Sequence, residues 1–386
     1  MISAADVPAT VSSGAPSTDA RPRILFLARS CNIHGMLAEL IRRSDTYYCP
    51  ANSNQALPAG TQLFTLRAAY KMREKLRAGE YDLVISSFIG DTLWRREVSW
   101  WRNGWKVARK LMTRPESLGP DLVPWMLKGT DVPLAVFDWE DNLIIPRRNW
   151  GLLERATCYF KTQTPRNPYK AFLFQDVRND CLFNIVREKR YRDWAHKLRP
   201  LSLGVTPPEG TETIEPQHIE KTTDVFFAGA MGYAWEREVG RHKLAKLRDE
   251  GYRIDLHCIT PGVPSLPQDE FLRRCSQAWL VWSPEGAGWD CMRHYWAPLI
   301  GSVPLMNHPD THRYMPLTDG INGLYYAVEG DDIQRVVRMA LQDKEKLRAM
   351  AAAGRDFVLQ YHTHARLADY LIAETLRTAK APATSP

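Results

Sequence analysis

Glycines and charged side chains are concentrated in the stretch SPEGAGWDCMRHYWAPLIGSVPLM, from Ser283 to Met306. Gly286 and Gly288 stand beside three charged residues, Glu285, Asp290 and Arg293. Carboxylates suit the paired hydroxyls of a ribose or another sugar, and a forked guanidinium suits a phosphate. The pattern therefore predicts a polar ligand held at the carboxyl end of a strand, where open α/β sheets bind their ligands. A surface loop closed by a solvated salt bridge is the alternative interpretation.

A second glycine motif, AGAMG, covers Ala228–Gly232 and lies between a strand pattern and a helical pattern. A strand that ends in glycines before a helix exposes free backbone N–H groups, which bind phosphate. Gly229 and Gly232 would allow a ligand to approach because they have no Cβ. Arg237 and Lys243, in the following helical pattern, are secondary candidates for the phosphate. The alternative is a tight turn with no ligand.

The first half of the chain carries candidate acids and bases. His34 follows the first apolar strand pattern and could act as a general base, because imidazole titrates near neutral pH. An ordinary loop histidine is the alternative. Asp138, Glu140 and Asp141 follow another apolar run, and we interpret them as cleft-facing groups that bind or deprotonate an acceptor.

Strands and helices must alternate to position these residues. The apolar run Arg23–Ala28 is followed by a polar loop and then a helical pattern. The same logic recurs where an amphipathic helix ends at Gly79 and Asp82–Ser87 forms a strand pattern, and again throughout the second half. Strand, loop and helix in this order are the unit of doubly wound α/β domains. The sequence predicts the α/β class, with two Rossmann-like, doubly wound domains.

The composition narrows the class of protein. Hydrophobic residues make up 44% and charged residues 25%, as in ordinary globular proteins, and no run of about 18 apolar residues occurs. The first residues lack the basic start and apolar core of a signal peptide. Seven scattered cysteines without a Cys-x-x-Cys pair argue for reduced thiols and against a zinc site. We expect a cytoplasmic protein.

Basic residues exceed acidic ones by 51 to 44, which weakly favours anionic partners. The run at 94–114 contains seven Arg or Lys, one acid and four tryptophans. This composition suits an interfacial helix on an anionic membrane surface. A core helix whose tryptophans pack beneath snorkelling arginines is the alternative. Nucleic-acid binding is not expected, because the charge is confined to one segment and no nucleic-acid motif appears.

With these motifs in view, SPEGAGWDCMRHYWAPLIGSVPLM resembles the donor-binding segment of GT-B-type glycosyltransferases of the group-1 kind, closest to the exostosin-like and bacterial branch. TDVFFAGAMGYAWERE resembles the first strand and phosphate loop of that family's donor domain. DGINGLYYAVEGDDIQRVVRMALQDKEKLRAMAAAGRDFV is similar to its C-terminal stretch. The resemblance covers Thr222 to about Tyr370. VFDWEDN and YFKTQ, in the first half, resemble the family only loosely.

The resemblance implies an enzyme that transfers a sugar from a nucleotide-sugar donor to a glycan or lipid-linked acceptor, as in polysaccharide biosynthesis. It also implies that two domains face each other across a cleft. The nucleotide sugar is then a substrate rather than a cofactor, and no bound metal is expected, because backbone dipoles and basic side chains neutralise the leaving diphosphate. A sugar-nucleotide epimerase and a degenerate, non-catalytic member that binds a glycan or nucleotide are the alternatives.

Trp296 departs from the family pattern. It stands where relatives have a glutamate that is expected to bind the donor ribose, and an indole cannot accept hydrogen bonds from a diol. Either Glu285 takes that role, or Trp296 stacks on a base or sugar, or the donor site is altered. Pro298 also interrupts the helical pattern.

At 386 residues, two domains are expected. His362 and His364 are expected to cap or pack a C-terminal helix rather than bind a metal. The predicted divisions are 1–22, a disordered leader; 23–201, an N-terminal acceptor-side domain; 202–222, a linker; 223–375, a C-terminal nucleotide-sugar-binding domain; and 376–386, a tail.

Overall fold

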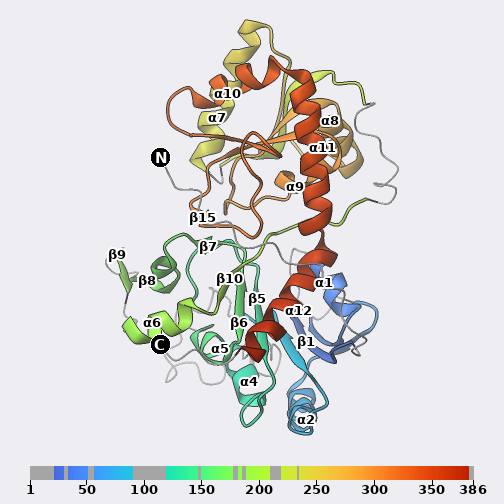
Figure 1. Cartoon of the computed structure of the whole chain (residues 1–386), viewed down its shortest axis with the longest axis vertical. Helices are drawn as coiled ribbons and strands as arrows, with labels where there is room; N and C mark the ends of the chain where they lie inside the picture. Colours follow the sequence, from blue (N-terminus) through green and yellow to red (C-terminus); the bar gives the residue numbers. More distant parts are fainter. Residues whose placement is uncertain are drawn as a thin grey trace.

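The structure is a computed structural model with two α/β lobes, one above the other (Figure 1). It describes residues 21–29, 34–50, 56–89, 119–146, 149–176, 181–184, 188–208, 219–232 and 234–381. The basic run at 94–114 and nearly all of the predicted leader lie outside these residues. The predicted fold class is confirmed, because both lobes are built on parallel sheets with helices on both faces.

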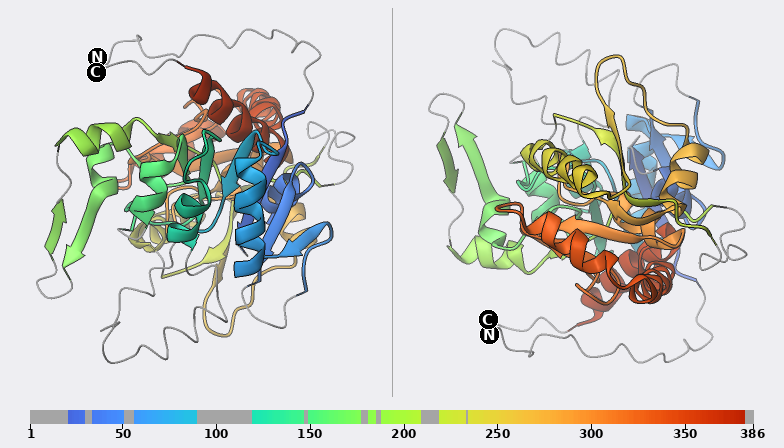
Figure 2. Two further views of the ribbon diagram at one scale, coloured as in Figure 1. Left: turned by 90° about the horizontal axis from the view of Figure 1, so that it is seen from below. Right: turned by 90° about the horizontal axis from the view of Figure 1, so that it is seen from above.

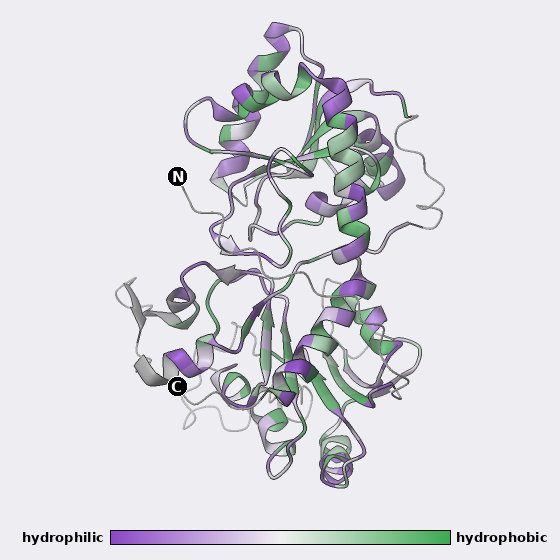
Figure 3. Cartoon of the chain, viewed as in Figure 1, coloured by the Kyte–Doolittle hydropathy of each residue, from purple (hydrophilic) through white to green (hydrophobic). Residues whose placement is uncertain are grey.

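The N-terminal lobe contains a seven-stranded sheet in the order β10-β6-β5-β4-β1-β2-β3. All of its neighbouring strands are parallel. The strands are β1 (Ile24–Arg29), β2 (Asp45–Cys49), β3 (Thr61–Leu63), β4 (Leu83–Ser86), β5 (Leu134–Asp138), β6 (Cys158–Lys161) and β10 (Leu198–Pro200). The central strands are almost continuously apolar, as expected for a parallel sheet buried on both faces (Figure 3).

Helices cover both faces of this sheet. One face packs against α2, α4, α5 and α6, and the other packs against α1 and α12. The helices are α1 (His34–Ile41), α2 (Leu66–Arg77), α4 (Gly119–Met126), α5 (Trp150–Arg155), α6 (Glu188–Ala195) and the short 3-10 helix η4 (Pro168–Phe172). The hairpin of β8 (Leu173–Asp176) and β9 (Cys181–Asn184) stands out from this lobe (Figure 2).

The C-terminal lobe contains a five-stranded parallel sheet in the order β12-β11-β13-β14-β16. Its strands are β11 (Thr223–Ala230), β12 (Ile254–Ile259), β13 (Ala278–Trp282), β14 (Val303–Asn307) and β16 (Leu324–Tyr326). Its helices are α7 (Trp235–Lys246), η7 (Leu247–Glu250), α8 (Gln268–Ser276), α9 (Arg293–Leu299), α10 (Asp332–Leu341) and α11 (Lys344–Tyr361). The motif Ala228–Gly232 begins in the last residues of β11, and the motif with Gly286 and Gly288 follows β13, so both lie at strand ends, as the sequence predicts.

Local sequence signals set several of these boundaries. The Thr65 side chain accepts a hydrogen bond from the Ala68 N–H and so caps the start of α2. Asp343 caps α11 in the same way through the Lys346 N–H. Gly79 and Gly251 have φ values of +71° and +90°, the left-handed conformation in which helices commonly end. The helix ends predicted at these two glycines are therefore confirmed.

The last helix, α12 (His364–Lys380), belongs to the N-terminal lobe. Leu367, Ala368 and Leu371 share one apolar core with residues of β1, β4, β5 and β6. Figure 1 shows α11 and α12 running one after the other along both lobes. The predicted divisions at 375 and 376 therefore fall inside a helix. The amphipathic pattern of this segment shows that it covers a sheet, but it does not show which sheet.

The chain passes between the lobes twice, and the two crossings lie side by side. The Val205 N–H donates to the carbonyl of His362 at 3.0 Å, and the His364 N–H donates to the carbonyl of Val205 at 2.9 Å. The side chains of His362 and His364 hydrogen-bond Ser202 and Thr206, and burial lowers both histidine pKa values to about 4. His362 ends α11 and His364 begins α12, so both pack at helix ends, as predicted. Both side chains are neutral, and we call the contact between residues 202–206 and 362–364 the waist.

A second contact joins the lobes away from the waist. Here β7 (Thr164–Pro165) of the N-terminal lobe pairs antiparallel with β15 (Thr311–His312) of the C-terminal lobe. The N–H of Arg166 also donates to the carbonyl of Asp310 at 3.2 Å. The two contacts hold the carboxyl ends of the two parallel sheets near each other.

Candidate active site

A cavity of about 400 Å³ lies between the lobes. This volume is within the range of small-molecule sites. Most of its wall comes from the C-terminal lobe, with Leu203 from the waist and Asp141 from the N-terminal lobe. The lining residues are Asp141, Leu203, Arg237, Phe271, Gly286, Ala287, Gly288, Asp290, Cys291, Met292, Arg293 and Trp296.

Two arginines bring the two glycine motifs together at this cavity. Arg293 donates through Nη1 to the carbonyl of Ala228 at 3.1 Å. Arg237 donates to the carbonyls of Ala230 and Glu285, the latter at 2.8 Å. The end of β11 and the loop after β13 therefore meet at one cavity.

Gly229 and Gly232 do not line the cavity, and the structure gives them roles that differ from the predicted phosphate contact. A β-carbon on Gly229 would lie 2.8 Å from Nη1 of Arg293, so this glycine makes room for the arginine. Gly232 has a φ of +80°, which glycine adopts without strain, and a β-carbon there would meet nothing within 4 Å. Glycine is therefore required at this position by the backbone conformation of the turn, and not by the close approach of another group.

Arg293 retains unused hydrogen-bonding capacity. Its Nε and Nη2 atoms are buried and have no hydrogen-bond partner in the described part of the chain. A buried donor left unpaired costs about 1–3 kcal/mol. An anion in the cavity would remove that cost, so Arg293 is the strongest candidate for binding a phosphate.

Asp290 makes three contacts within the protein. It pairs with Arg313 at 2.6 Å, accepts from Tyr295 Oη at 2.7 Å and accepts from the Leu203 N–H at 2.7 Å. Burial, the largest single influence, raises the pKa of Asp290, but the charge of Arg313 and the hydrogen bonds that the carboxylate accepts together outweigh burial and hold the pKa below its ordinary value. Asp290 also lines the cavity, so its contact with ligand hydroxyls stays a prediction beside this structural role. Its carboxylate anchors the glycine loop to the waist.

Glu285 is half-buried at the other end of the loop. The Asn307 side chain donates to its carboxylate at 2.8 Å and accepts from its backbone N–H at 3.0 Å. Burial, together with the nearby carboxylate of Glu236, raises the pKa of Glu285. Glu285 does not line the cavity itself, although the glycine that follows it does.

The spacing Gly286-x-Gly288 has a steric cause. A side chain at Gly286 would collide with the guanidinium of Arg237, and one at Gly288 would collide with the amide of Gln163. The Gly286 N–H donates to the carbonyl of Gly288 at 2.9 Å, which closes the loop into a tight turn. The loop is thus packed between an arginine of its own lobe and a glutamine of the other lobe.

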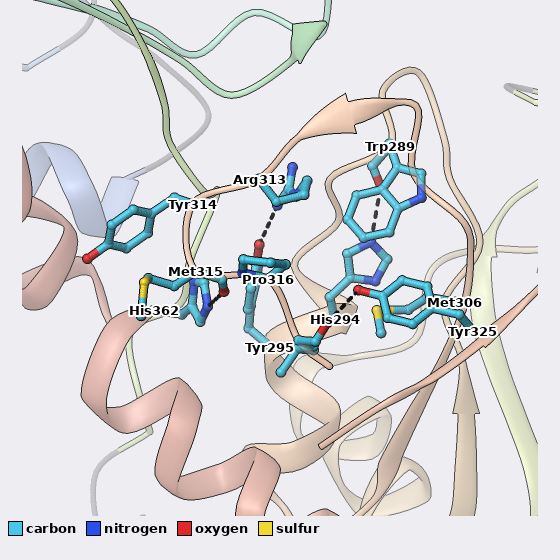
Figure 4. A pocket seen from close by; sticks show the side chains of 11 residues that line it. Trp289, His294, Tyr295, Met306, Arg313, Tyr314, Met315, Pro316, Tyr325 and His362 are labelled. Atoms are coloured by element: carbon cyan, nitrogen blue, oxygen red, sulfur yellow. Dashed lines mark hydrogen bonds between the residues drawn. The ribbon is translucent and has the colours of Figure 1, made fainter. Parts of the chain in front are cut away.

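An aromatic and polar cluster supports the loop from below (Figure 4). The Trp289 indole donates to the carbonyl of Asn307 at 2.9 Å, and its ring lies 4.7 Å from the Arg313 guanidinium. His294 Nε2 donates to the carbonyl of Trp289 at 3.0 Å, while Nδ1 lies 2.8 Å from Ser283 Oγ. Burial lowers the pKa of His294 to about 3, so this histidine is neutral.

Trp296 lies on α9 and lines the cavity with Phe271 and Met292. The helix is short, and Pro298 sits in its last turn. This wall offers an apolar surface where the family pattern has a carboxylate. An aromatic ring can stack on a flat base or on the apolar face of a sugar. This wall therefore favours the interpretation in which Trp296 stacks on the base or the sugar of the donor.

Lys243 lies outside the cavity. Its amine donates to the carbonyls of Val328, at 2.8 Å, and Gly330, so it braces α7 against the loop before α10. The prediction that Lys243 binds the phosphate is corrected, because its donors serve this loop.

In the N-terminal lobe, Asp138 is also occupied. It is 1% exposed, pairs with Lys161 at 3.2 Å and accepts from Tyr159 Oη at 2.9 Å. Asp138 and Lys161 end neighbouring strands and face each other in register. The prediction that Asp138 acts as an acceptor-side base is corrected, because its carboxylate is a buried structural anion.

Glu140 and Asp141 keep their predicted candidacy. Burial, and then the charge of Asp138, raise the pKa of Glu140 to about 7. Asp141 lies at the edge of the cavity, where desolvation and then the charge of Asp290 raise its pKa. A carboxyl that titrates near pH 7 suits general base catalysis. His34 begins α1, but its side chain lies outside the described part of the structure.

Sequence reasoning missed three residues that shape the site: Gln163, Asn307 and Arg313. Gln163 follows β6 and Asn307 ends β14, so each stands at the carboxyl end of a parallel strand. Because ligands of open α/β sheets bind at this end of the strands, that position in the sequence could have identified both residues as site candidates. Arg313 follows the short strand β15 and had no comparable signal.

Among the described residues, no group of three or more His, Cys, Asp and Glu side chains is placed to hold a metal ion. None of the described helices combines the length and apolar character that a membrane crossing requires.

Comparison with known proteins places the fold. No protein-family model matches the chain, and no curated protein matches its sequence. Solved structures do match. Anabaena HepE in complex with UDP and glucose shares 13% identity over 92% of this chain and 99% of its own, with a TM-score of 0.50. A glycosyltransferase from Rickettsia africae shares 9% identity over 94% and 100%, with a TM-score of 0.52.

The lipopolysaccharide outer core galactosyltransferase WaaB is similar in the same way. It shares 9% identity over 91% of this chain and 99% of its own, with a TM-score of 0.51. These likenesses span nearly the whole of each chain. The chain therefore has the GT-B-like fold, with two Rossmann-like domains facing each other across a cleft.

Proposed function

We propose that this protein is a glycosyltransferase that moves a sugar from a nucleotide-sugar donor to an acceptor hydroxyl. The single observation that carries the proposal is Arg293, with two buried guanidinium nitrogens unpaired at the wall of the interlobe cavity. The similar structures add support, since HepE was crystallised with UDP, glucose and UDP-glucose.

In the proposed reaction, the bond between the anomeric carbon and the diphosphate oxygen breaks as a bond to the acceptor oxygen forms. The nucleoside diphosphate leaves with the electron pair of the broken bond. Arg293 would stabilise the charge that develops on it, and such preorganised donors are usually the largest electrostatic contribution to catalysis. Arg237 lines the same wall, but its hydrogen bonds to Ala230 and Glu285 assign it to holding the loop in place.

The acceptor would enter from the N-terminal lobe. Glu140 is adjacent to the cavity-lining Asp141. The ionised carboxylate of Glu140 would accept the proton of the acceptor hydroxyl. The pKa of Glu140, about 7, permits this at neutral pH. Trp296 and Phe271 would stack on the base or the sugar. The acceptor that we propose is a glycan or a lipid-linked saccharide. We also propose that the transfer needs no metal ion and that the protein belongs to the exostosin-like branch.

Cys291 offers a direct test, because this thiol is half-exposed and lines the cavity. We expect bound UDP to slow the alkylation of Cys291 and to leave the alkylation of Cys258 unchanged. Mass spectrometry of the two cysteine-containing peptides measures both rates. Calorimetry with UDP, GDP, ADP and CDP would identify the nucleotide. Absence of binding to all four would contradict the proposal.

Product analysis separates the alternatives. With UDP-glucose alone, a glycosyltransferase releases UDP slowly by transfer to water, and glucose appears in equal amount. An epimerase would return a second UDP-sugar and no UDP. A non-catalytic member would bind the nucleotide and release nothing.

A further inference from the structure

Gln163 connects the N-terminal lobe to the glycine loop of the other lobe. It lies two residues beyond the end of β6 and is 1% exposed. Its Oε1 accepts the backbone N–H of Trp289 at 3.2 Å. Its amide also occupies the space beside Gly288 that a β-carbon would need.

The orientation of this amide follows from its partner. A backbone N–H only donates, so the Gln163 atom that faces Trp289 must be the carbonyl oxygen. The Nε2 atom then lies against Gly288 and has no hydrogen-bond partner in the described part of the chain. The contact therefore gains one hydrogen bond and leaves a buried donor unpaired, which is unfavourable.

The other anchors of the loop come from its own lobe or the waist. Glu285 is held by Asn307 and Arg237, and Asp290 is held by Arg313 and Leu203. Between these anchors, Asn307 accepts from the Trp289 indole and His294 donates to the Trp289 carbonyl, while the backbone N–H of Trp289 is bound by Gln163. The segment that carries Gln163 leads directly into β7, whose pairing with β15 joins the lobes.

We propose that Gln163 is a positioning residue that sets the shape of the Gly286–Gly288 loop when the two lobes are in contact. This inference rests on the proposed role of that loop in donor binding. The C-terminal lobe binds the nucleotide through Arg293 with or without this contact. Turnover of the donor requires the contact, because the loop then adopts the tight turn that lines the cavity. Transfer is thereby linked to the presence of the acceptor-side lobe.

Two substitutions at Gln163 separate its functions. Gln163→Met keeps the length and packing of the side chain but removes the acceptor for Trp289. Gln163→Glu keeps an acceptor oxygen at the same place, so it is the rescue variant. Gln342→Met is the matched control, because Gln342 is exposed at the end of α10.

Hydrogen–deuterium exchange of the peptide containing Trp289 tests the positioning without any ligand. In the full-length protein we expect exchange of this amide to be about tenfold faster in Gln163→Met, because a lost hydrogen bond of roughly 1.4 kcal/mol gives this factor. The Gln163→Glu and Gln342→Met proteins should exchange like the unaltered chain. Unchanged exchange in Gln163→Met overturns the proposal.

UDP-glucose turnover and UDP affinity test the consequence. We expect Gln163→Met to lower kcat for UDP release about tenfold or more while the Kd of UDP stays within about twofold, and Gln163→Glu to restore most of kcat. Equal losses in affinity and turnover, or a Glu variant as impaired as the Met variant, would also overturn it. If the unaltered chain binds no nucleotide while exchange responds as expected, the donor function fails and the positioning of the loop stands.

Discussion

Arg293 Nη1 lies 3.1 Å from the carbonyl oxygen of Ala228, so the first residue of α9 is fixed to the last residues of strand β11. One N–H of the guanidinium is used in this contact, and Phe227 lies beneath the group at 5.2 Å. Nε and Nη2 remain without a partner in the described part of the chain. The guanidinium is held in place before any ligand arrives, which is the condition for preorganised charge stabilisation.

The first prediction concerns Arg293. Arg293→Gln should lower kcat for UDP release from UDP-glucose about 10²–10³-fold, the usual effect of removing one preorganised donor. Steady-state kinetics measures this, and circular dichroism should show an unchanged fold. Arg338→Gln is the control, because Arg338 pairs with Glu250 at the surface. A rate like that of the control would contradict the assignment.

The second prediction concerns the pH dependence of Glu140. Its pKa is raised to about 7, and only the ionised carboxylate accepts a proton, so kcat should rise with pH through about 7 and then level off. In Glu140→Gln this limb should disappear along with most of the activity. A pH–rate profile between pH 5 and 9 measures both effects. An unchanged limb in the variant would assign the base to another group, such as Asp141.

The same raised pKa makes a third prediction about stability. Between its ordinary value of 4.5 and about 7, the folded protein holds a proton on Glu140 that the unfolded chain has lost. The contribution of this group to stability therefore falls as pH rises through that window. Thermal melts should show that Glu140→Gln raises Tm relative to the unaltered chain at pH 8 but not at pH 4. A Tm difference independent of pH would contradict this.

The fourth prediction separates support from ligand binding at Asp290. Asp290→Asn leaves Arg313 buried without its counter-ion, which typically destabilises a protein by about 3–5 kcal/mol. Chemical denaturation should show this loss in the absence of any ligand. Asp224→Asn is a comparison, because Asp224 pairs with a half-exposed Arg253 and should cost less. A stable Asp290→Asn protein with a raised KM would favour a ligand contact instead.

The fifth prediction concerns Lys243. Lys243→Met should lower Tm, because the carbonyls of Val328 and Gly330 lose their donor, and it should leave the Kd of UDP unchanged. Calorimetry and thermal melts on the same preparation measure both quantities. Weaker UDP binding without a change in Tm would return Lys243 to the phosphate site.

The sequence predicted the strands and loops that carry the site better than it predicted which side chains contact one another there. Short apolar runs followed by glycine-containing loops located β11 and β13, because such runs are typical of parallel strands. It did not show that Gly229 makes room for Arg293, or that Gly288 makes room for Gln163. Those requirements come from residues 64 and 125 positions away in the chain, and no local pattern encodes them.

Two of the corrections had a local signal. Lys243 lies six residues after Arg237, so about 600° of helical rotation places the two side chains on different faces of α7. Asp138 and Lys161 each end a strand, and opposite charges at the ends of neighbouring strands favour a pair once the strand order is known. The strand order itself is a property of the whole fold, which the sequence did not supply.

The position of α12 has a consequence for how the protein is made. Because residues 364–380 complete the apolar cover of the first sheet, part of one face of that sheet stays uncovered until this helix has been synthesised. The N-terminal lobe, although most of it is synthesised first, therefore completes its apolar core only after the C-terminal lobe has been synthesised. A nascent chain that stops before this helix would expose Phe26, Ile85 and Phe160 and would be a natural substrate for chaperones and proteases.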